Sequence, residues 1–438
     1  MQYLPNLIFA IVLIIGVGFF VKNIRKLIRN IKLGKAVDRS DNKSARWKNM
    51  AKIALGQYKM VRRPVSGILH VAVYLGFVII NIEVLEIIID GLFGTHRVFQ
   101  PFLGDAFYGF LIATFEILAA LVFVAVIIFW IRRNVIRVKR FWNKEMTAWP
   151  KNDGNIILYF EMVLMSLFIV MNATDVQFQE AGVGNSISQF IAPLFNGASV
   201  ETLHSIEQSA WWVHIIGILV FLNYLYYSKH LHILLAFPNT FYAKLKPKGQ
   251  IDNLESVTKE VQLMMDPSAD PYAAPPEGAE DEVPEKFGAS DVADLNWVQL
   301  MNAYTCTECG RCTSACPASL TGKELSPRAI MMKTRDRMEE VGKNIDANGG
   351  EFKDDGKQLL NDYISPEELW ACTSCNACVQ ECPVNIDPLS IIMDMRRYLV
   401  MEESAAPQEL NMMMTNIENN GAPWQYNQMD RLNWKDEE

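Results

Sequence analysis

The chain has 438 residues, of which 50% are hydrophobic and 21% are charged. This composition excludes a disordered or collagen-like chain, and the length allows two or three domains. Charge is unevenly divided: residues 1–250 carry 26 basic and 14 acidic side chains, whereas residues 251–438 carry 15 and 35. We therefore expect two physically different halves, and we expect no nucleic-acid partner for the acidic half.

Five apolar segments in the first half are each long enough to cross a bilayer. They cover residues 4–21, 65–89, 107–131, 155–172 and 211–237. Basic residues gather in alternate loops: 14 in 22–63, seven in 132–154 and three in 238–250, against one in 90–106 and none in 173–210. The positive-inside rule then predicts a multi-pass protein of the cytoplasmic membrane, with the N-terminus outside and the C-terminal half in the cytoplasm. The first span is not preceded by a basic run, so we expect it to be retained rather than cleaved as a signal peptide.

The second half divides by composition. Residues 251–298 form a connector rich in Asp, Glu, Pro and Ala, which cannot bury enough apolar surface to fold alone. In residues 299–402, Ser326 and Pro327 predict the N-cap and first position of a helix running to about Val341, and a second helix is expected over 388–401. Strand-like runs are few. We therefore predict an all-α protein: a five-helix transmembrane bundle (1–250), an α-helical dicluster domain (299–402) and a tail (403–438).

All eight cysteines lie between Cys306 and Cys382, in two copies of the pattern C-x2-C-x2-C-x3-C-P that start 66 residues apart. Three cysteines at this spacing bind one [4Fe–4S] cluster, and the fourth binds the other cluster. This rule gives two interleaved ligand sets: Cys306, Cys309, Cys312 and Cys382 for the first cluster, and Cys372, Cys375, Cys378 and Cys316 for the second. A pair of zinc sites is the alternative. Two clusters without the signature of a substrate pocket predict one-electron transfer, and we assign no catalytic residue.

The membrane half contains all six histidines. His70 lies six residues after Pro64, and His232 lies six residues before Pro238, so both lie about 9 Å inside the ends of their expected helices. Two imidazoles at equal depth on facing helices are the axial ligands that haem b requires. We therefore predict a His70–His232 pair, with His230, about 200° around the helix, as the alternative to His232.

A second haem is an open alternative. His214 lies 18 residues before His232, which is five helical turns, and would share its face near the outer surface. The facing position on the second span is Ile80, which cannot ligate iron, so the partner would have to be His96 or His204 from outer loops.

Four glutamates fall within the expected spans: Glu83, Glu86, Glu116 and Glu161. Unpaired charge is costly there. The first three lie toward the outer half and are candidates for a proton path to a quinone site, unless they lie at the headgroup boundary or in water-filled gaps. Arg62, Arg63 and Lys229 are placed to bind haem propionates, although solvation of positive-inside charge explains them equally well.

These motifs resemble two known families. Residues 1–240 look like the nitrate reductase gamma-subunit type of membrane cytochrome b, through residues 63–70 (RPVSGILH), residues 228–232 (SKHLH) and the 18-residue spacing of His214 and His232. That family binds two haems through two histidines on its second span. This chain has only His70 there.

The second half is similar to the iron–sulfur region of heterodisulfide reductase-like proteins, through residues 304–312 (YTCTECGRC) and 321–327 (TGKELSP). Fused proteins of this type, including those that take electrons from electron-transfer flavoprotein, continue into a cysteine-rich CCG domain. This sequence ends at Glu438 without that motif, and residues 416–424 (NIENNGAPW) look like the stretch that precedes it. The resemblance implies a separate CCG subunit, on which the tail with Trp424 and Trp434 would dock.

Together these features predict a membrane electron-transfer subunit of a quinone oxidoreductase complex. Electrons would pass between a cytoplasmic partner (a CCG-domain subunit or a flavoprotein dehydrogenase), the two [4Fe–4S] clusters, one haem b and a membrane quinone. Two alternatives stand beside this prediction. One is a haem-free membrane ferredoxin that reduces a metal during oxidase assembly, a class that usually carries a β-rich C-terminal domain. The other is a scaffold that tethers a redox complex.

Overall fold

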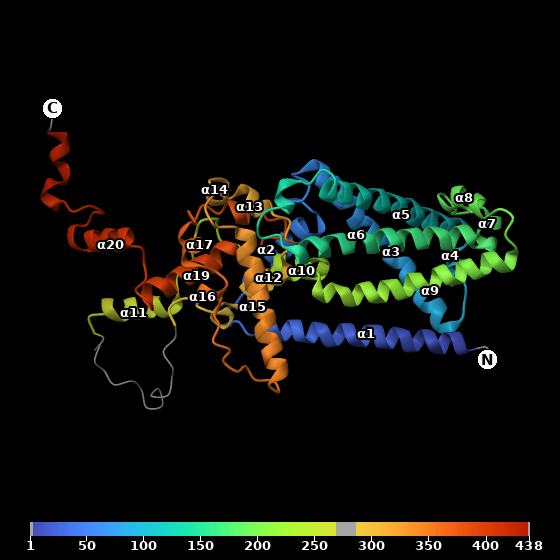
Figure 1. Cartoon of the computed structure of the whole chain (residues 1–438), viewed down its shortest axis with the longest axis horizontal. Coiled ribbons are helices and arrows are strands. Elements are labelled where there is room, and N and C mark those ends of the chain that lie inside the picture. Colours follow the sequence, from blue (N-terminus) through green and yellow to red (C-terminus); the bar gives the residue numbers. More distant parts are fainter. Residues whose placement is uncertain (1–2, 269–285, 437–438) are drawn as a thin grey trace.

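The computed structural model describes residues 3–268 and 286–436. Figure 1 shows a bundle of long helices joined end to end with a domain of short helices, with the N-terminus at the free end of the bundle and the C-terminus beyond the domain. We call the end of the bundle that contacts this domain the near end, and the opposite end the far end. The Pro-rich stretch of the expected connector, 270–277, lies outside the described residues.

The described residues contain five helices that are long and apolar enough to cross a membrane. They are α1 (Leu4–Ile31), α3 (Pro64–Phe93), α5 (Asp105–Asn134), α6 (Ala148–Thr174) and α9 (Val200–Tyr224). Short helices join them: α2 (Lys43–Met50), α4 (Gln100–Leu103), α7 (Val176–Ala181) and α8 (Ser188–Ile191). Five helices of this length and composition make the chain a multi-pass membrane protein.

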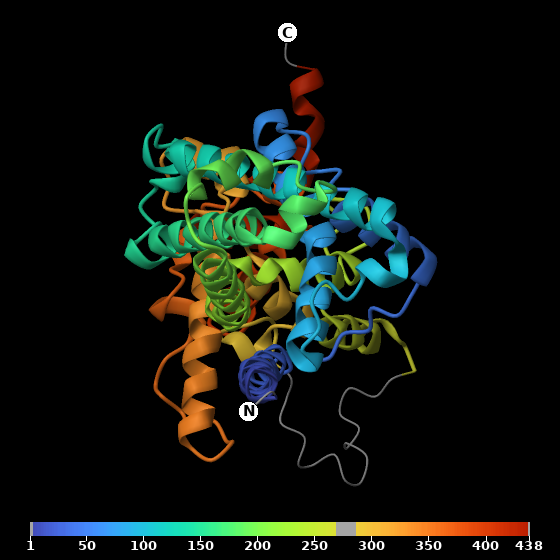
Figure 2. The same ribbon diagram turned by 90° about the vertical axis from the view of Figure 1, so that its right-hand side faces the viewer.

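The four inner helices pack on a core that includes Ile112, Phe115 and Phe168, all fully buried. A Cβ atom on Gly76 of α3 would lie 2.3 Å from the Val122 side chain of α5, so only glycine lets these two helices approach so closely. In Figure 2, seen along the bundle, α1 lies at its edge. Most of the apolar side chains of α1 point outward, as expected for a helix that faces lipid.

The fifth span differs from its expected course over 211–237. Helix α9 ends at Tyr224, two short 3-10 turns follow, and α10 (His232–Phe241) begins a new helix. Asp153 of α6 explains the break, because its carboxylate accepts hydrogen bonds from the Tyr224 hydroxyl (2.6 Å), the Ser228 hydroxyl (2.6 Å) and the Lys229 backbone N–H (3.1 Å). The prediction of one continuous helix is wrong, and so is the inference that His214 and His232 share its face.

The second domain packs short helices around one long helix. They are α12 (Trp297–Thr305), α13 (Arg311–Ala315), α14 (Pro317–Leu320), α15 (Pro327–Ala347), α16 (Leu359–Asp362), α17 (Pro366–Trp370), α18 (Ala377–Glu381) and α19 (Pro388–Met401). Ser326 caps α15 as expected, accepting a hydrogen bond from the Ala329 N–H. Within the described ranges there is no β-strand, only two isolated bridges, so the all-α prediction is confirmed.

Part of the expected connector belongs to this domain. Ala289, Val292 and Leu295 are buried in its core, because the first residues after 285 run along the domain rather than through solvent. Arg337 of α15 fixes this stretch with an ion pair to Asp291 at 2.8 Å. Earlier in the connector lies α11 (Glu255–Met265).

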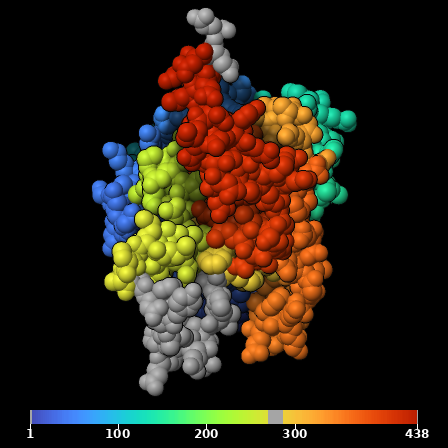
Figure 3. Space-filling view, turned by 90° about the vertical axis from the view of Figure 1, so that its left-hand side faces the viewer, coloured from blue at the N-terminus to red at the C-terminus, as the bar shows by residue number. Residues whose placement is uncertain are grey.

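The tail leaves the body of the protein. It consists of α20 (Gln408–Asn420) and the 3-10 helix Gln428–Lys435. Figure 3 shows it in red, projecting past the domain that carries the cysteines.

Several contacts hold the domain on the near end, including those of α1 and the loops beside it. At the end of α1, Asn30 donates to the Tyr304 hydroxyl at 3.0 Å. The backbone of Lys35 exchanges hydrogen bonds with Leu295 and Trp297. Arg328, which is fully buried, pairs with Glu145 of the loop between α5 and α6 at 2.6 Å.

Candidate metal centre

The two cysteine motifs fold into the same backbone shape. In the first loop, Glu308 and Gly310 have positive φ angles of 54° and 69°. The matching positions of the second loop, Ser374 and Asn376, have φ angles of 55° and 59°. Left-handed residues are uncommon outside glycine, so their recurrence at equal places shows that both loops turn in the same way.

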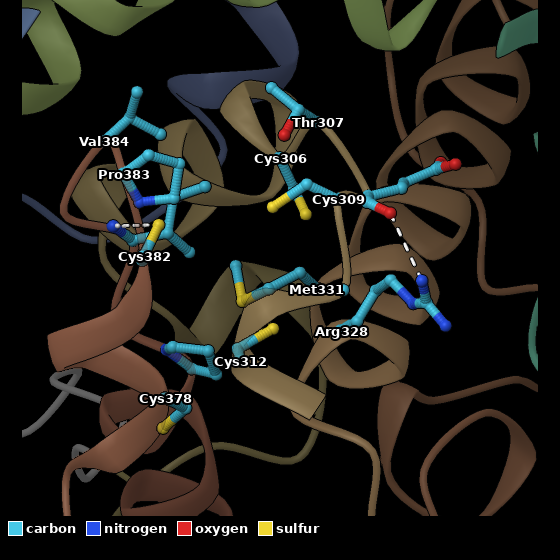
Figure 4. Close-up of a pocket in the computed structure, with 14 residues that line it drawn as sticks. Cys306, Thr307, Cys309, Cys312, Arg328, Met331, Cys378, Cys382, Pro383 and Val384 are labelled. Carbon is cyan, nitrogen blue, oxygen red and sulfur yellow. Dashed lines mark hydrogen bonds between the residues drawn. The ribbon is translucent and has the colours of Figure 1, made fainter. Parts of the chain in front are cut away.

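The structure gathers the sulfur atoms of the first predicted ligand set. Cys306, Cys309, Cys312 and Cys382 line one cavity, and Cys378 of the second predicted set lies at the same cavity (Figure 4). The Ile386 N–H donates to the Cys382 sulfur at 3.2 Å, a contact of the kind that tunes cluster potentials.

Members of the second predicted ligand set also lie near one another. Cys316 lies close enough to Cys372 and Cys378 for its charge to act on both. Cys375 is the exposed member of the set.

The chemistry of these thiols fits iron. Burial raises the pKa of Cys306 to about 12 and that of Cys382 to about 11, so a bound cation is needed to hold them as thiolates at neutral pH. In the described ranges no three His, Cys, Asp or Glu side chains converge on a single ion. Each iron of a four-iron cluster takes one cysteine, so such a cluster does not need three side chains at a single ion.

A group of three histidines lies at the near end. The rings of His70 and His232 have centroids 6.3 Å apart, and the rings of His230 and His232 are 5.3 Å apart. Imidazoles that bind one metal ion from opposite sides have ring centres roughly 6 Å apart, since each metal–nitrogen bond is about 2 Å long. The His70–His232 separation therefore suits an axial pair.

The surroundings of the Nδ1 atoms of His70 and His232 also suit metal ligation by these two rings. His232 Nδ1 lies 3.2 Å from the Lys229 carbonyl oxygen, a contact that orients the ring and leaves Nε2 free. In the part of the chain that the structure describes, His70 Nδ1 is buried and has no hydrogen-bond partner. A buried polar atom without a partner is costly, and a bound group at this place would remove that cost.

The first cysteine loop rests directly on the histidine segment. Lys229, next to His230, forms an ion pair at 2.5 Å with Glu308, next to Cys309, and both side chains are almost fully buried. Burial by itself would raise the pKa of Glu308, but the positive charges of Lys229 and Arg335 outweigh it and lower this pKa.

A second set of contacts joins both cysteine motifs to the segment that leads into α3. Arg311 donates to the Lys59 carbonyl at 3.1 Å, and Arg63 pairs with Glu381 at 2.9 Å. Arg63 and Lys229, two of the candidates for binding propionates, thus have carboxylate partners in the protein. Arg62, the third, lies against Tyr58.

The far end contains His214 in isolation. It is buried beside Phe168, with ring centroids 6.2 Å apart. The two proposed partners have other contacts: His96 Nε2 lies 3.3 Å from Asp175, and His204 Nδ1 lies 3.0 Å from Glu207. The structure does not bring either of them to His214.

The glutamates of the spans divide into two kinds. Glu86 accepts from the Phe99 N–H (2.8 Å) and the Tyr108 hydroxyl (2.9 Å). Glu116 accepts from the Asn172 amide (3.0 Å) and from two backbone N–H groups, at residues 187 (2.7 Å) and 188 (3.0 Å). By contrast, Glu83 Oε2 is buried without a partner among the described residues, and Glu161 is also buried.

Sequence reasoning missed the residues that organise both ends. Asp153 holds the turns of residues 225–231 that carry His230 and lead to His232, which we call the histidine segment. The only feature of the sequence that could have pointed to Asp153 is a carboxylate near the start of an apolar run. At the far end, Arg97 donates to Asp175 (3.0 Å), Tyr108 (3.3 Å) and Asn172 (3.2 Å) and packs on an aromatic ring. The sequence feature that could have pointed to Arg97 is that it is the only Lys or Arg in the two outer loops, residues 90–106 and 173–210.

Comparison with known proteins supports the iron–sulfur assignment. The 4Fe-4S dicluster domain family matches residues 305–386. The chain is 29% identical, over 98% of its length, to the probable iron-sulfur-binding oxidoreductase FadF of Bacillus subtilis, and 23% identical, also over 98%, to the EtfAB:quinone oxidoreductase of Syntrophomonas wolfei. It covers 61% and 59% of those two proteins, so it spans about three fifths of their length.

Shorter matches agree with this result. Over 35% of its length the chain is 32% identical to a probable membrane-anchored ferredoxin of Chromohalobacter salexigens, covering 25% of that protein. Subunits C and D of heterodisulfide reductases from Methanosarcina species also match. No solved structure matches. The chain is therefore homologous to iron–sulfur oxidoreductases and heterodisulfide reductase subunits, and it joins a 4Fe-4S dicluster domain to a multi-pass membrane bundle.

Proposed function

We propose that this protein is the membrane electron-transfer subunit of a quinone oxidoreductase complex, in which two [4Fe–4S] clusters and a haem b relay electrons between a redox partner and a membrane quinone. The homology to iron–sulfur oxidoreductases supports the relay. The printed name of one relative, EtfAB:quinone oxidoreductase, supports the quinone.

The observation that carries this proposal is the direct contact between the first cysteine loop and the histidine segment. The buried Lys229–Glu308 pair joins the residue beside Cys309 to the residue beside His230. A protein that only stored clusters would have no need to fix its ligand loop against histidines of the membrane bundle. In the second loop Cys375 is exposed at the surface, where a partner has access to it.

His70 and His232 are the proposed axial ligands, with His230 as the alternative to His232. His214 would serve only a second haem. Among the glutamates, Glu83 is the best candidate for carrying a proton to a quinone site, because Glu86 and Glu116 have structural hydrogen bonds while one Glu83 oxygen has no partner in the described residues. Glu86 and Glu116 remain candidates on that path.

The orientation and partner are part of the proposal. The basic loops lie at the near end, which supports a cytoplasmic position for the clusters in a chain of the cytoplasmic membrane. The partner would be a separate CCG-domain subunit or a flavoprotein dehydrogenase. The tail is suited to dock on it, since Met412, Ile417, Trp424 and Trp434 are exposed large apolar side chains.

The test is a dithionite-reduced minus oxidised spectrum of the purified full chain, with a pyridine haemochrome assay for quantity. A b-type band at about one haem per chain, bleached by quinone addition, is the expected result. A preparation with intact clusters and no haem would exclude the relay.

That second outcome would favour a haem-free membrane ferredoxin. One observation supports this candidate, the match to a probable membrane-anchored ferredoxin. Unlike the relay, it assigns no role to the three clustered histidines.

A further inference from the structure

A large polar cleft opens where the near end of the bundle meets the dicluster domain. Its volume is about 870 Å³, and four parts of the chain line it: the segment between α1 and α3, residues 243–254, residues 296–302, and the stretch 376–397 that contains α18 and α19. It is separate from the cavity of the first cysteine set and from the histidines. Figure 3 shows this end of the molecule, with the segment near residue 250 in yellow-green beside the red α19.

Basic side chains outnumber acidic ones on the wall of the cleft. Nine Lys and Arg side chains line it, against five Asp side chains. Four of the basic groups are neutralised by carboxylates: Arg46 by Asp41, Lys244 and Lys246 by Asp252, and Arg397 by Asp394.

The remaining basic groups come mostly from one short segment. Arg39, Lys52, Lys59 and Arg62 precede α3, and Lys248 faces them from the opposite wall. In the described ranges the structure records no carboxylate within ion-pair distance of these five groups. Arg39 Nε is buried and has no hydrogen-bond partner there. Such a group of cations, with one buried donor unused, is the arrangement that binds a phosphate.

The rim of the cleft is suited to a membrane surface. The same segment exposes Leu55 and Val61, and it carries the exposed aromatic side chains Trp47 and Tyr58. Aromatic side chains concentrate at membrane–water interfaces, and basic pockets beside transmembrane helices bind acidic headgroups. The apolar side chains would contact acyl chains while the cations contact the headgroup.

We propose that this cleft binds the phosphate group of an anionic phospholipid and so joins the basic segment before α3 to the second cysteine loop. Asn376 and Val379, on the loop and helix of that second motif, form part of its wall. A bound headgroup would neutralise the unpaired cations and link the membrane surface to the dicluster domain. This proposal is independent of the haem and of the quinone.

The test uses the detergent-solubilised full chain and fluorescent short-chain phosphatidylglycerol, with binding followed by polarisation. Phosphatidylcholine with the same label is the neutral probe. The variant is Arg39→Gln/Lys52→Gln, which removes two charges without breaking a recorded ion pair. The matched control is Lys323→Gln/Lys353→Gln, which removes two exposed lysines that do not line the cleft. Cluster absorption verifies that each variant is folded.

We expect phosphatidylglycerol to bind at least tenfold more tightly than phosphatidylcholine. The cleft variant should weaken binding about 25-fold, because each basic side chain near such a site contributes about fivefold. The control should bind as the unchanged chain does. Competition by excess inorganic phosphate, together with retention of inorganic phosphate alone, would identify a soluble phosphate compound as the source of the bound group. Equal binding of the two lipids, or an equal loss in the control variant, would overturn the proposal.

Discussion

The near end and the far end of the helix bundle both bury histidines and charged groups, yet they differ in how those groups are satisfied. At the far end, Glu116 accepts three hydrogen bonds and Arg97 donates three. At the near end, His70 Nδ1 has no partner in the described residues, and its ring faces His232 at 6.3 Å. His214 Nδ1 and Glu83 Oε2, farther along the bundle, also lack a partner among the described residues, so an unpaired atom alone does not distinguish the two ends. The difference is that a second imidazole faces His70 at a distance suited to one bound metal ion.

The largest expected difference is spectroscopic. His70→Leu should abolish the b-type absorption band, because the iron loses an axial ligand that no neighbouring histidine of α3 replaces. His214→Leu should leave one full band, since His96 and His204, the two histidines proposed to pair with it, contact Asp175 and Glu207 instead. Reduced minus oxidised spectra at equal cluster iron measure both. A band that survives in His70→Leu and vanishes in His214→Leu would reverse the comparison.

The next difference is in stability. Glu116→Ala leaves a buried amide and two buried N–H groups without an acceptor, and we expect a loss of about 3 kcal/mol in the free energy of unfolding. Glu83→Gln should change it by less than about 1 kcal/mol, because it removes a buried carboxylate oxygen that has no recorded partner. Thermal unfolding in one detergent provides the measurement. Equal losses in the two variants would show that the hydrogen bonds of Glu116 are not what stabilises the far end.

A smaller loss of stability is expected at the near end, where Asp153 accepts hydrogen bonds from the residues that precede the histidines. Asp153→Ala should cost about 2 kcal/mol, because the Tyr224 and Ser228 hydroxyls lose their shared acceptor. Since Asp153 positions the histidine segment, the variant should also shift the midpoint potential of the haem. Tyr224→Phe, which removes one of these hydrogen bonds, is the control and should cost about 1 kcal/mol. A normal potential in Asp153→Ala would restrict this residue to stability.

The smallest effect is the pH response of the far end. The hydrogen bond to Asp175 raises the pKa of His96, so its stabilisation is complete below the ordinary histidine pKa and is lost as the pH rises through the higher folded value. Because His96 is half exposed, we expect a loss of no more than about 0.5 kcal/mol between pH 6 and pH 8. His96→Gln should remove this slope in thermal unfolding. An unchanged slope would assign it to another group.

The cysteine spacing predicted its region well because the chemistry is local. Both loops obey the same sequence pattern, and the two helices at Pro327 and Pro388 begin where the prolines indicate. The match of residues 305–386 to the dicluster family rests on the same pattern. Cysteines this close in sequence determine the shape of their own loop, so the loop could be predicted without knowledge of distant contacts.

The histidine segment was harder to predict because its shape depends on a distant residue. Counting from Pro64 and Pro238 led to His70 and His232, whose rings the structure does bring together. The comparison of depths, however, assumed that the fifth helix is unbroken. Residues 224–228 contain no Gly or Pro that would predict an interruption. The break follows from Asp153, which lies more than 70 residues earlier. The far-end network escaped prediction for the same reason, since Arg97 finds its partners on three separate helices or loops.

The repeated left-handed turns of the two cysteine loops have a consequence for polarity. Taken alone, a duplicated unit has two interchangeable poles, and nothing in its backbone distinguishes an inlet from an outlet. The side chain at one repeated position breaks this equivalence: Glu308 forms an ion pair with Lys229 of the bundle, whereas the Ser374 hydroxyl donates to Met393 within its own domain. The difference at this one position ties the first cysteine loop, rather than the second, to the histidine segment. It therefore gives the duplicated domain a defined direction relative to the bundle.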